Sequence, residues 1–127
     1  MIVAAVLLLL HARDVDVYFN DRMIPMDAKP IVRGSRVLVP LRGVAEALGA
    51  NVRYVEGENK VFLKRGDRTV EMSIRSAEMM ANMKPVRVDQ PPMVVGGRVL
   101  VPLRFVSQYL GAKVTWHAAK RRVDISL

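Results

Sequence analysis

The chain of 127 residues contains no cysteine, one tryptophan and two histidines. The absence of cysteine excludes disulfides, thiolate metal sites and a cysteine nucleophile. Stability must therefore come from packing of the core. Hydrophobic residues make up 51% of the chain, which is enough for a packed core and indicates a folded protein.

Acidic residues are also scarce: 12 of them stand against 20 lysines and arginines, so the formal net charge is +8. This balance favours an anionic partner, and nucleic acid, anionic cell-wall polymer and acidic lipid all satisfy it. Residues 13–71 carry eleven basic and nine acidic side chains, whereas residues 72–127 carry nine basic and three acidic ones. Most of the surplus charge therefore belongs to the second half.

Long hydrophobic runs are limited to one, the nine residues Ile2–Leu10. As a helix this run reaches only about 14 Å, too short to span a hydrocarbon core of about 30 Å. Its length is typical of the apolar region of a signal peptide, and Ala12 offers a small residue for cleavage, although no basic residues precede the run. We predict a truncated signal peptide over residues 1–12, whose true start lies upstream, with the protein secreted or attached to the cell wall. The alternative is a buried first strand or helix.

The sequence repeats itself. The heptad RVLVPLR of Arg36–Arg42 recurs letter for letter in Arg98–Arg104, an offset of 62, and Leu48-Gly49-Ala50 returns as Leu110-Gly111-Ala112. A match of this length at constant offset predicts a tandem duplication, with a first repeat over residues 13–71 and a second over residues 72–127. Each repeat is close to the lower size limit for an independent core, so we expect the two to fold as one cooperative unit.

Each repeat reads as strands, one short helix, then strands. In the first repeat, Gly34-Ser35 predicts a hairpin turn before the strand Arg36–Val39, and Pro40 marks the change from strand to helix. The apolar residues that follow recur every three or four positions, the pattern of a two-turn helix, and Gly49 is placed to cap it in the left-handed conformation. The stripe consists of Leu41, Val44, Ala45 and Leu48, and of Leu103, Val106, Ser107 and Leu110 in the second repeat, with Gly111 as its cap.

Alternating residues around Val52 and Tyr54 predict a half-buried strand, which turns at residues 56–59 into a second strand at residues 61–63. A two-turn helix must bury its stripe on a sheet to be stable. The predicted fold class is therefore α+β: antiparallel β-sheets and hairpins with one short helix per repeat.

The repeated heptad, the Leu-Gly-Ala helix end and the strand that carries Tyr54 or Trp116 together resemble the copper amine oxidase N-terminal-like (stalk) domain family, in two tandem copies. The resemblance covers Val15 to Leu127. It implies a sheet wrapped on a helix, export, and a binding or spacer role. It implies no amine oxidase activity and no cofactor.

The residues themselves offer no catalytic constellation, so we predict no enzyme. Amine oxidase chemistry needs three histidine ligands, whereas only His11 and His117 are present, and His117 reads as a surface or packing residue. Glu56 and Glu58 flank Gly57 in a turn and read as solvated. No serine occupies a Gly-X-Ser-X-Gly elbow.

The repeated arginines admit two interpretations, anion binding or a structural role. For Arg42 and Arg104 we favour the structural role, with Arg42 paired to Glu46 one helical turn on. For Arg36 and Arg98 both interpretations stay open. Tyr54 and Trp116 share a repeat position, and we favour packing in the core or between repeats over a platform for sugar stacking.

The candidate binding site is the basic surface of the second repeat. It centres on a predicted hairpin turn that carries three consecutive cations, where the first repeat has Glu58-Asn59-Lys60. The candidate residues are Lys84, Arg87, Lys113, Lys120, Arg121 and Arg122. We expect them to bind an anionic wall polysaccharide, or another envelope component, by charge. The alternative function is a cytosolic basic protein that binds nucleic acid, for which the sequence shows no helix-turn-helix, zinc or ribonucleoprotein motif.

Overall fold

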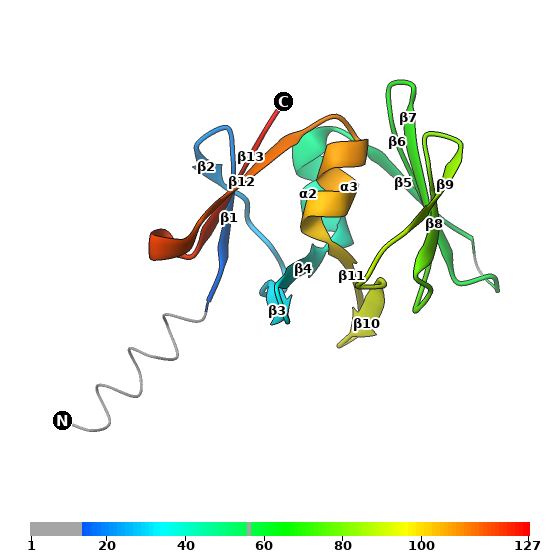
Figure 1. Cartoon of the computed structure of the whole chain (residues 1–127), viewed down its shortest axis with the longest axis horizontal. Coiled ribbons are helices and arrows are strands. Elements are labelled where there is room, and N and C mark those ends of the chain that lie inside the picture. The colour runs from blue at the N-terminus through cyan, green and yellow to red at the C-terminus, as the bar shows by residue number, and fades with distance from the viewer. Residues whose placement is uncertain (1–13, 56) are drawn as a thin grey trace.

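The computed structural model describes residues 14–55 and 57–127, so the predicted signal peptide and Glu56 lie outside the described residues. Two short helices, α2 and α3, stand side by side in the middle of the molecule, with one sheet at each end and a third below them (Figure 1). The sheets are antiparallel except for one pair of strands. The predicted α+β class, rich in hairpins and with short helices, is confirmed in this form.

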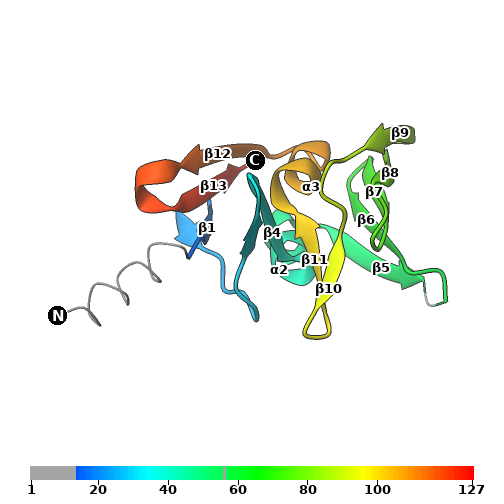
Figure 2. The same cartoon turned by 60° about the horizontal axis from the view of Figure 1, so that its bottom comes forward.

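The repeated heptads form the middle of the central sheet. Its strand order is β10-β11-β4-β3. The bounds are β3 (Ile31–Arg33), β4 (Arg36–Pro40), β10 (Met93–Val95) and β11 (Arg98–Pro102). β4 and β11 run antiparallel with Val39 opposite Val101, so the two identical segments pair with one another (Figure 2). The hairpin predicted at Gly34-Ser35 is present, and an equivalent hairpin turns at Gly96-Gly97.

A helix follows each central strand directly: α2 (Leu41–Leu48) follows β4, and α3 (Leu103–Tyr109) follows β11. Pro40 and Pro102 end the strands, since proline has no N–H to donate to a sheet and its fixed φ suits the start of a helix. Gly49 has φ of 69° and Gly111 has φ of 95°, which confirms the predicted left-handed caps. Every residue of the predicted apolar stripes is buried.

Each end sheet continues from one of the helices. The sheet after α2 consists of β5 (Asn51–Val55), β6 (Lys60–Arg65), β7 (Arg68–Ser73), β8 (Glu78–Ala81) and β9 (Lys84–Arg87), in that order. The sheet after α3 has the order β12-β13-β1-β2. Its members are β12 (Lys113–His117), β13 (Arg122–Ser126), β1 (Asp16–Phe19) and β2 (Arg22–Met23), with the 3₁₀ turn η1 (Ala118–Lys120) between β12 and β13.

Both end sheets combine strands from the two halves of the chain. β1, from the first half, lies parallel to β13, from the second, with Asp16 opposite Arg122. The opening hairpin of the second half, β8–β9, joins the sheet of β5 and β6 through β7. Buried side chains from both halves therefore form one core.

One arginine connects the two helices. Arg65, at the end of β6, donates from Nε to the carbonyl of Leu48 and from Nη1 to the carbonyl of Leu110, both at 3.0 Å. These carbonyls lie at the carboxyl ends of α2 and α3, where the helices lack internal donors and carry partial negative charge. A single cation therefore satisfies both helix ends at once.

The turns of the opening hairpins use left-handed residues other than glycine. Asn20 and Asp21 have φ of 47° and 67°, and Asn82 and Met83 have φ of 50° and 68°. Two consecutive positive values are the requirement of a tight two-residue hairpin, which asparagine and aspartate tolerate better than most residues. Met83 is therefore the strained member of the set, and its side chain is 82% exposed.

Candidate functional site

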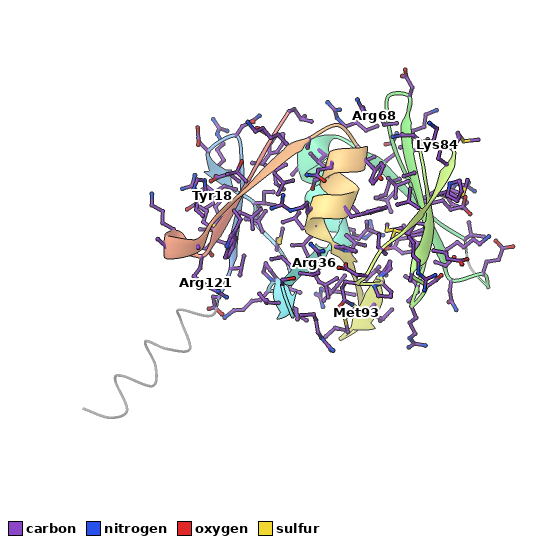
Figure 3. All side chains as sticks on the ribbon, viewed as in Figure 1. Tyr18, Arg36, Arg68, Lys84, Met93 and Arg121 are labelled. Carbon is purple, nitrogen blue, oxygen red and sulfur yellow. The ribbon has the colours of Figure 1, made fainter. Side chains whose placement is uncertain are left out.

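The six candidate basic residues do not form one patch. Lys84 begins β9 in the five-stranded sheet, whereas Lys113, Lys120 and Arg121 belong to the sheet at the other end of the molecule. Figure 3 places Lys84 and Arg121 at opposite ends. The expectation of a single surface centred on one turn is therefore wrong for Lys84. Although Lys84 belongs to the same repeat as the turn, its strand β9 joins the sheet of β5–β8, whereas the turn connects β12 and β13 in the other end sheet.

Arg122 is also placed differently from the prediction, which put it in a turn. It begins β13, and its Nη2 lies 2.7 Å from Oδ1 of Asp124. Its guanidinium covers the ring of Tyr18 on β1, 3.7 Å from the ring centroid. The hydrogen bonds that Arg122 donates to Asp124 raise the pKa of Arg122. The turn ends one residue earlier, at Arg121, which has φ of 51°. Arg122 is therefore committed to contacts within its own sheet.

Two of the candidate residues, Arg87 and Arg121, line the same cleft, which has a volume of about 880 Å³. The cleft lies between α3, the end of β9, the hairpin β3–β4 and the sheet of β12 and β13. Arg36 and Arg104 also line it, and Asp89 contributes the single carboxylate among its lining residues. Its volume falls within the range of about 300–1,000 Å³ typical of ligand sites.

The four arginines of the cleft differ in how far neighbouring carboxylates neutralise them. Arg36 holds Asp89 at 2.7 Å, and its hydrogen bonds lower the pKa of that carboxyl. Arg87 lies 3.8 Å from Glu78. Arg104 is exposed on α3 and forms no ion pair within 4 Å with any residue that the structure describes. The cleft therefore keeps excess positive charge on its α3 wall.

Trp116 forms an aromatic part of the cleft wall. It is 37% exposed, and the guanidinium of Arg121 lies over its ring at 5.6 Å. The packing interpretation that we favoured for Trp116 and Tyr54 is wrong, since Tyr54 is 41% exposed. Both residues lie two positions beyond a valine that packs on the core, on strands at the edges of their sheets. The rings remain at the surface on these edge strands.

Of the repeated arginines after each proline, Arg42 has a partner within the chain as expected, but a different one. The guanidinium of Arg42 lies over the ring of Tyr54 at 5.8 Å, so its partner is that ring and not Glu46. Arg98 bonds to Asp27 at 2.7 Å, as Arg36 does to Asp89. For Arg36 and Arg98 the structure thus shows an ion-pairing role. Arg104 instead lines the cleft.

The other residues considered for chemistry lie outside the cleft. His117 is half exposed, with Nε2 at 2.7 Å from Oδ2 of Asp124. Glu58 is exposed in the turn between β5 and β6. Among residues 14–55 and 57–127, no group of three or more histidine, aspartate or glutamate side chains is placed to hold a metal ion. The cleft itself presents guanidinium, amide and aromatic groups, which suit retention of an anion.

A family model described as copper amine oxidase N-terminal domain matches residues 18–125. The chain belongs to this family. The N-terminal domain of the family is a non-catalytic domain. The match is a single copy that spans both halves, so the prediction of two tandem family copies is not confirmed. No curated protein matches the chain.

Sequence reasoning missed several residues of this family member's cleft. Phe105 and Gln108 on α3 were not singled out, although both line it. The available signal was a difference between the halves: Gly43 and Glu46 occupy the equivalent positions in α2. No helix among the described residues has the length and apolarity needed to cross a membrane.

Proposed function

We propose that the chain is a non-catalytic module of the cell envelope, exported by a signal peptide at residues 1–12, that binds anionic wall polymer. The observation that carries this proposal is a cleft whose lining residues include four arginines and one carboxylate, that of Asp89, with Arg104 in no ion pair with any described residue. Guanidinium groups bind carboxylates and phosphates in fixed geometry, and a concave basic surface concentrates polyanions around it. A binding role, with or without a spacer role, agrees with the non-catalytic character of the family domain.

We further propose that the domain arose by duplication of one unit. The seven identical residues of each heptad occupy equivalent positions in β4 and β11 and at the start of each helix. The hairpins β3–β4 and β10–β11 share the same register, with Ile31 opposite Leu38 and Met93 opposite Leu100. Equivalent sequence, order and register support descent of both halves from one ancestor.

The test of polymer binding is retention of the protein on purified cell walls at increasing salt. Retention by charge falls steeply between about 50 and 500 mM salt, because the Debye length shrinks from about 14 to 4 Å. The informative variant is Arg87→Gln with Arg121→Asn, which removes two positive charges from the cleft. Asn is the residue that the first half carries at the position of Arg121.

The matched control is Lys64→Glu, which changes the net charge by the same amount on an exposed residue of β6 outside the cleft lining. We expect the double variant to lose most retention and the control to keep it, with both melting as the parent does. Equal retention of the two variants would reject the cleft as the binding site. Retention that does not respond to salt would reject binding by charge.

Export is tested separately, by sequencing the amino terminus of the protein recovered from culture supernatant, wall and cytosol. The proposal expects a product that begins near Arg13 in the supernatant or wall fraction. An intact chain confined to the cytosol would contradict export and support the alternative, a cytosolic protein that binds nucleic acid.

A further inference from the structure

The aromatic wall of the cleft carries an inference about the ligand, which rests on the proposed binding function. Trp116 keeps 37% of its surface exposed although it is the largest apolar side chain in the cleft. Phe105 on α3 lines the same cleft and packs on Tyr109, with ring centroids 4.6 Å apart. Leaving apolar ring surface in water forgoes the free energy of its burial. The guanidinium of Arg121 lies over this ring at 5.6 Å, so the part of the indole that stays exposed is the surface that a ligand can cover.

Polar side chains of α3 supply the groups for an anion. Arg104 and Gln108 lie one turn apart on the same face of α3, and both line the cleft. Arg104 forms no ion pair within 4 Å with any described residue. Its guanidinium can bond both oxygens of a carboxylate, and the Gln108 amide can both donate to and accept from hydroxyl groups.

A ligand that contacts the Trp116 ring and also bonds to Arg104 and Gln108 must combine a ring with an apolar face, hydroxyl groups and a negative charge. The C–H face of a sugar ring packs on an indole, and its hydroxyls bond to amides. We propose that the cleft binds an acidic polysaccharide, with one sugar ring stacked on Trp116 and the carboxylate of a sugar acid bonded to Arg104. A polymer of phosphates without sugar rings meets the charge requirement but leaves the indole uncovered.

The first half of the chain supplies an internal comparison. At the offset of 62, Tyr54 replaces Trp116, Arg42 replaces Arg104 and Glu46 replaces Gln108. There Arg42 itself lies over the ring, at 5.8 Å from its centroid, whereas the guanidinium over Trp116 is that of Arg121, at 5.6 Å, and not that of Arg104. The carboxylate of Glu46 also repels anions from that helix face. An arginine and an aromatic ring thus occur in both halves, but the second half alone combines them with a neutral amide.

The experiment uses the full chain and three probes: a galacturonic acid tetramer, its fully methyl-esterified form, and poly(glycerol phosphate). Trp116 is the one tryptophan of the chain, so its fluorescence reports directly on the proposed platform. We expect the acidic tetramer to saturate the protein and change the Trp116 emission. The ester keeps the rings without the charge, and poly(glycerol phosphate) keeps the charge without the rings. Each of these two probes is expected to bind at least about tenfold more weakly than the acidic tetramer.

The variants are measured by calorimetry, because substitution of Trp116 removes the fluorophore. Trp116→Ala and Arg104→Gln are each expected to weaken binding of the acidic tetramer by about tenfold or more. Tyr54→Ala, the matched control at the equivalent position, is expected to leave it unchanged. All three variants should melt within a few degrees of the parent, since the substituted side chains are exposed.

The results that overturn the inference differ from those that overturn the proposed function. If poly(glycerol phosphate) binds as tightly as the acidic tetramer, or if Trp116→Ala binds that tetramer as the parent does, the sugar platform is rejected while binding by charge stands. If the protein is retained on cell walls but binds no tetramer, the ligand class is rejected. If the protein neither binds the probes nor is retained on walls, both proposals fail.

Discussion

Arg36 and Asp89, 53 residues apart in the chain, form a two-point ion pair in which Nε lies 3.0 Å from both carboxylate oxygens and Nη2 lies 2.7 Å from Oδ2. Arg98 and Asp27 repeat the arrangement at 2.7 Å, and each of the four residues has its equivalent at the offset of 62. Each arginine therefore binds the aspartate of the other half. The two ion pairs connect the halves at the first residues of β4 and β11, the middle strands of the central sheet.

These ion pairs predict acid sensitivity. The pKa of Asp27 is lowered by hydrogen bonds from Arg98, and that of Asp89 by hydrogen bonds from Arg36. A carboxyl whose pKa falls on folding stabilises the native state above its unfolded pKa of about 3.9 and loses that contribution as the pH drops through the folded value. The urea midpoint should therefore fall as the pH is lowered below about 4. In the double variant Asp27→Asn with Asp89→Asn, the urea midpoint should fall less steeply with pH. A pH dependence equal to that of the parent would contradict the assignment of acid sensitivity to these ion pairs.

The two helix caps predict unequal costs for the same substitution. A Cβ on Gly49 meets nothing within 4 Å, so Gly49→Val is expected to lose about 1–2 kcal/mol, from left-handed strain alone. A Cβ on Gly111 lies 2.8 Å from Nε of Arg68 and 3.2 Å from Nη1 of Arg65. Gly111→Val must therefore displace Arg68 and disturb the bond from Arg65 to Leu110. Urea unfolding should rank Gly111→Val as the more damaging, and the reverse order would contradict this account.

Ser107 predicts a stabilising substitution. Its Oγ is fully buried in α3 and has no hydrogen-bond partner among residues 14–55 and 57–127, whereas the first half carries Ala45 at the equivalent position. A buried hydroxyl without a partner costs about 1–3 kcal/mol of desolvation. Ser107→Ala should raise the free energy of unfolding by about 1 kcal/mol, and Ala45→Ser should lower it. A drop in stability for Ser107→Ala would show that the hydroxyl finds a partner in solution.

The shared sheets predict that the halves do not fold separately. A fragment of residues 77–127 contains β13 without its partner β1, and β8 without its partner β7. We expect this fragment to lack the sharp thermal transition of the full chain when melting is followed by circular dichroism. A transition in the fragment as sharp as that of the parent, and at the same temperature, would show independent folding.

The local elements of this fold could be predicted from the sequence, whereas the pairing of distant strands could not. The spacing of Leu41, Val44 and Leu48 and the glycine after them determine α2, and its stripe is buried as expected. The register of the hairpin turn at Gly34-Ser35 follows from residues a few positions apart. Nothing local specifies that β1 pairs with β13, more than 100 residues later. Such pairings depend on the packing of the whole core.

The candidate site was predicted in part for the same reason. Arg87 and Arg121 were identified from the charge surplus of the second half, and both line the cleft. Arg122 was assigned to the turn because it follows two other cations, yet alternation with the buried Val123 and Ile125 places it in a strand. The exposure of Trp116 depends on its position on the edge strand β12 of the folded sheet. Its sequence neighbours do not determine that position.

The parallel pairing of β1 with β13 has a mechanical consequence. The chain enters β1 at Asp16 and leaves β13 at Ser126, so a pulling force applied to the residues before β1 and after β13 drags the two strands past one another along their length. Four residue pairs then carry the load together, and the ring of Tyr18 under the guanidinium of Arg122 must slide with them. An antiparallel hairpin pulled from its open end, in contrast, separates one pair at a time. Because lifetime under load follows the unfolding rate, this domain is expected to hold longest when it is stretched from its two ends.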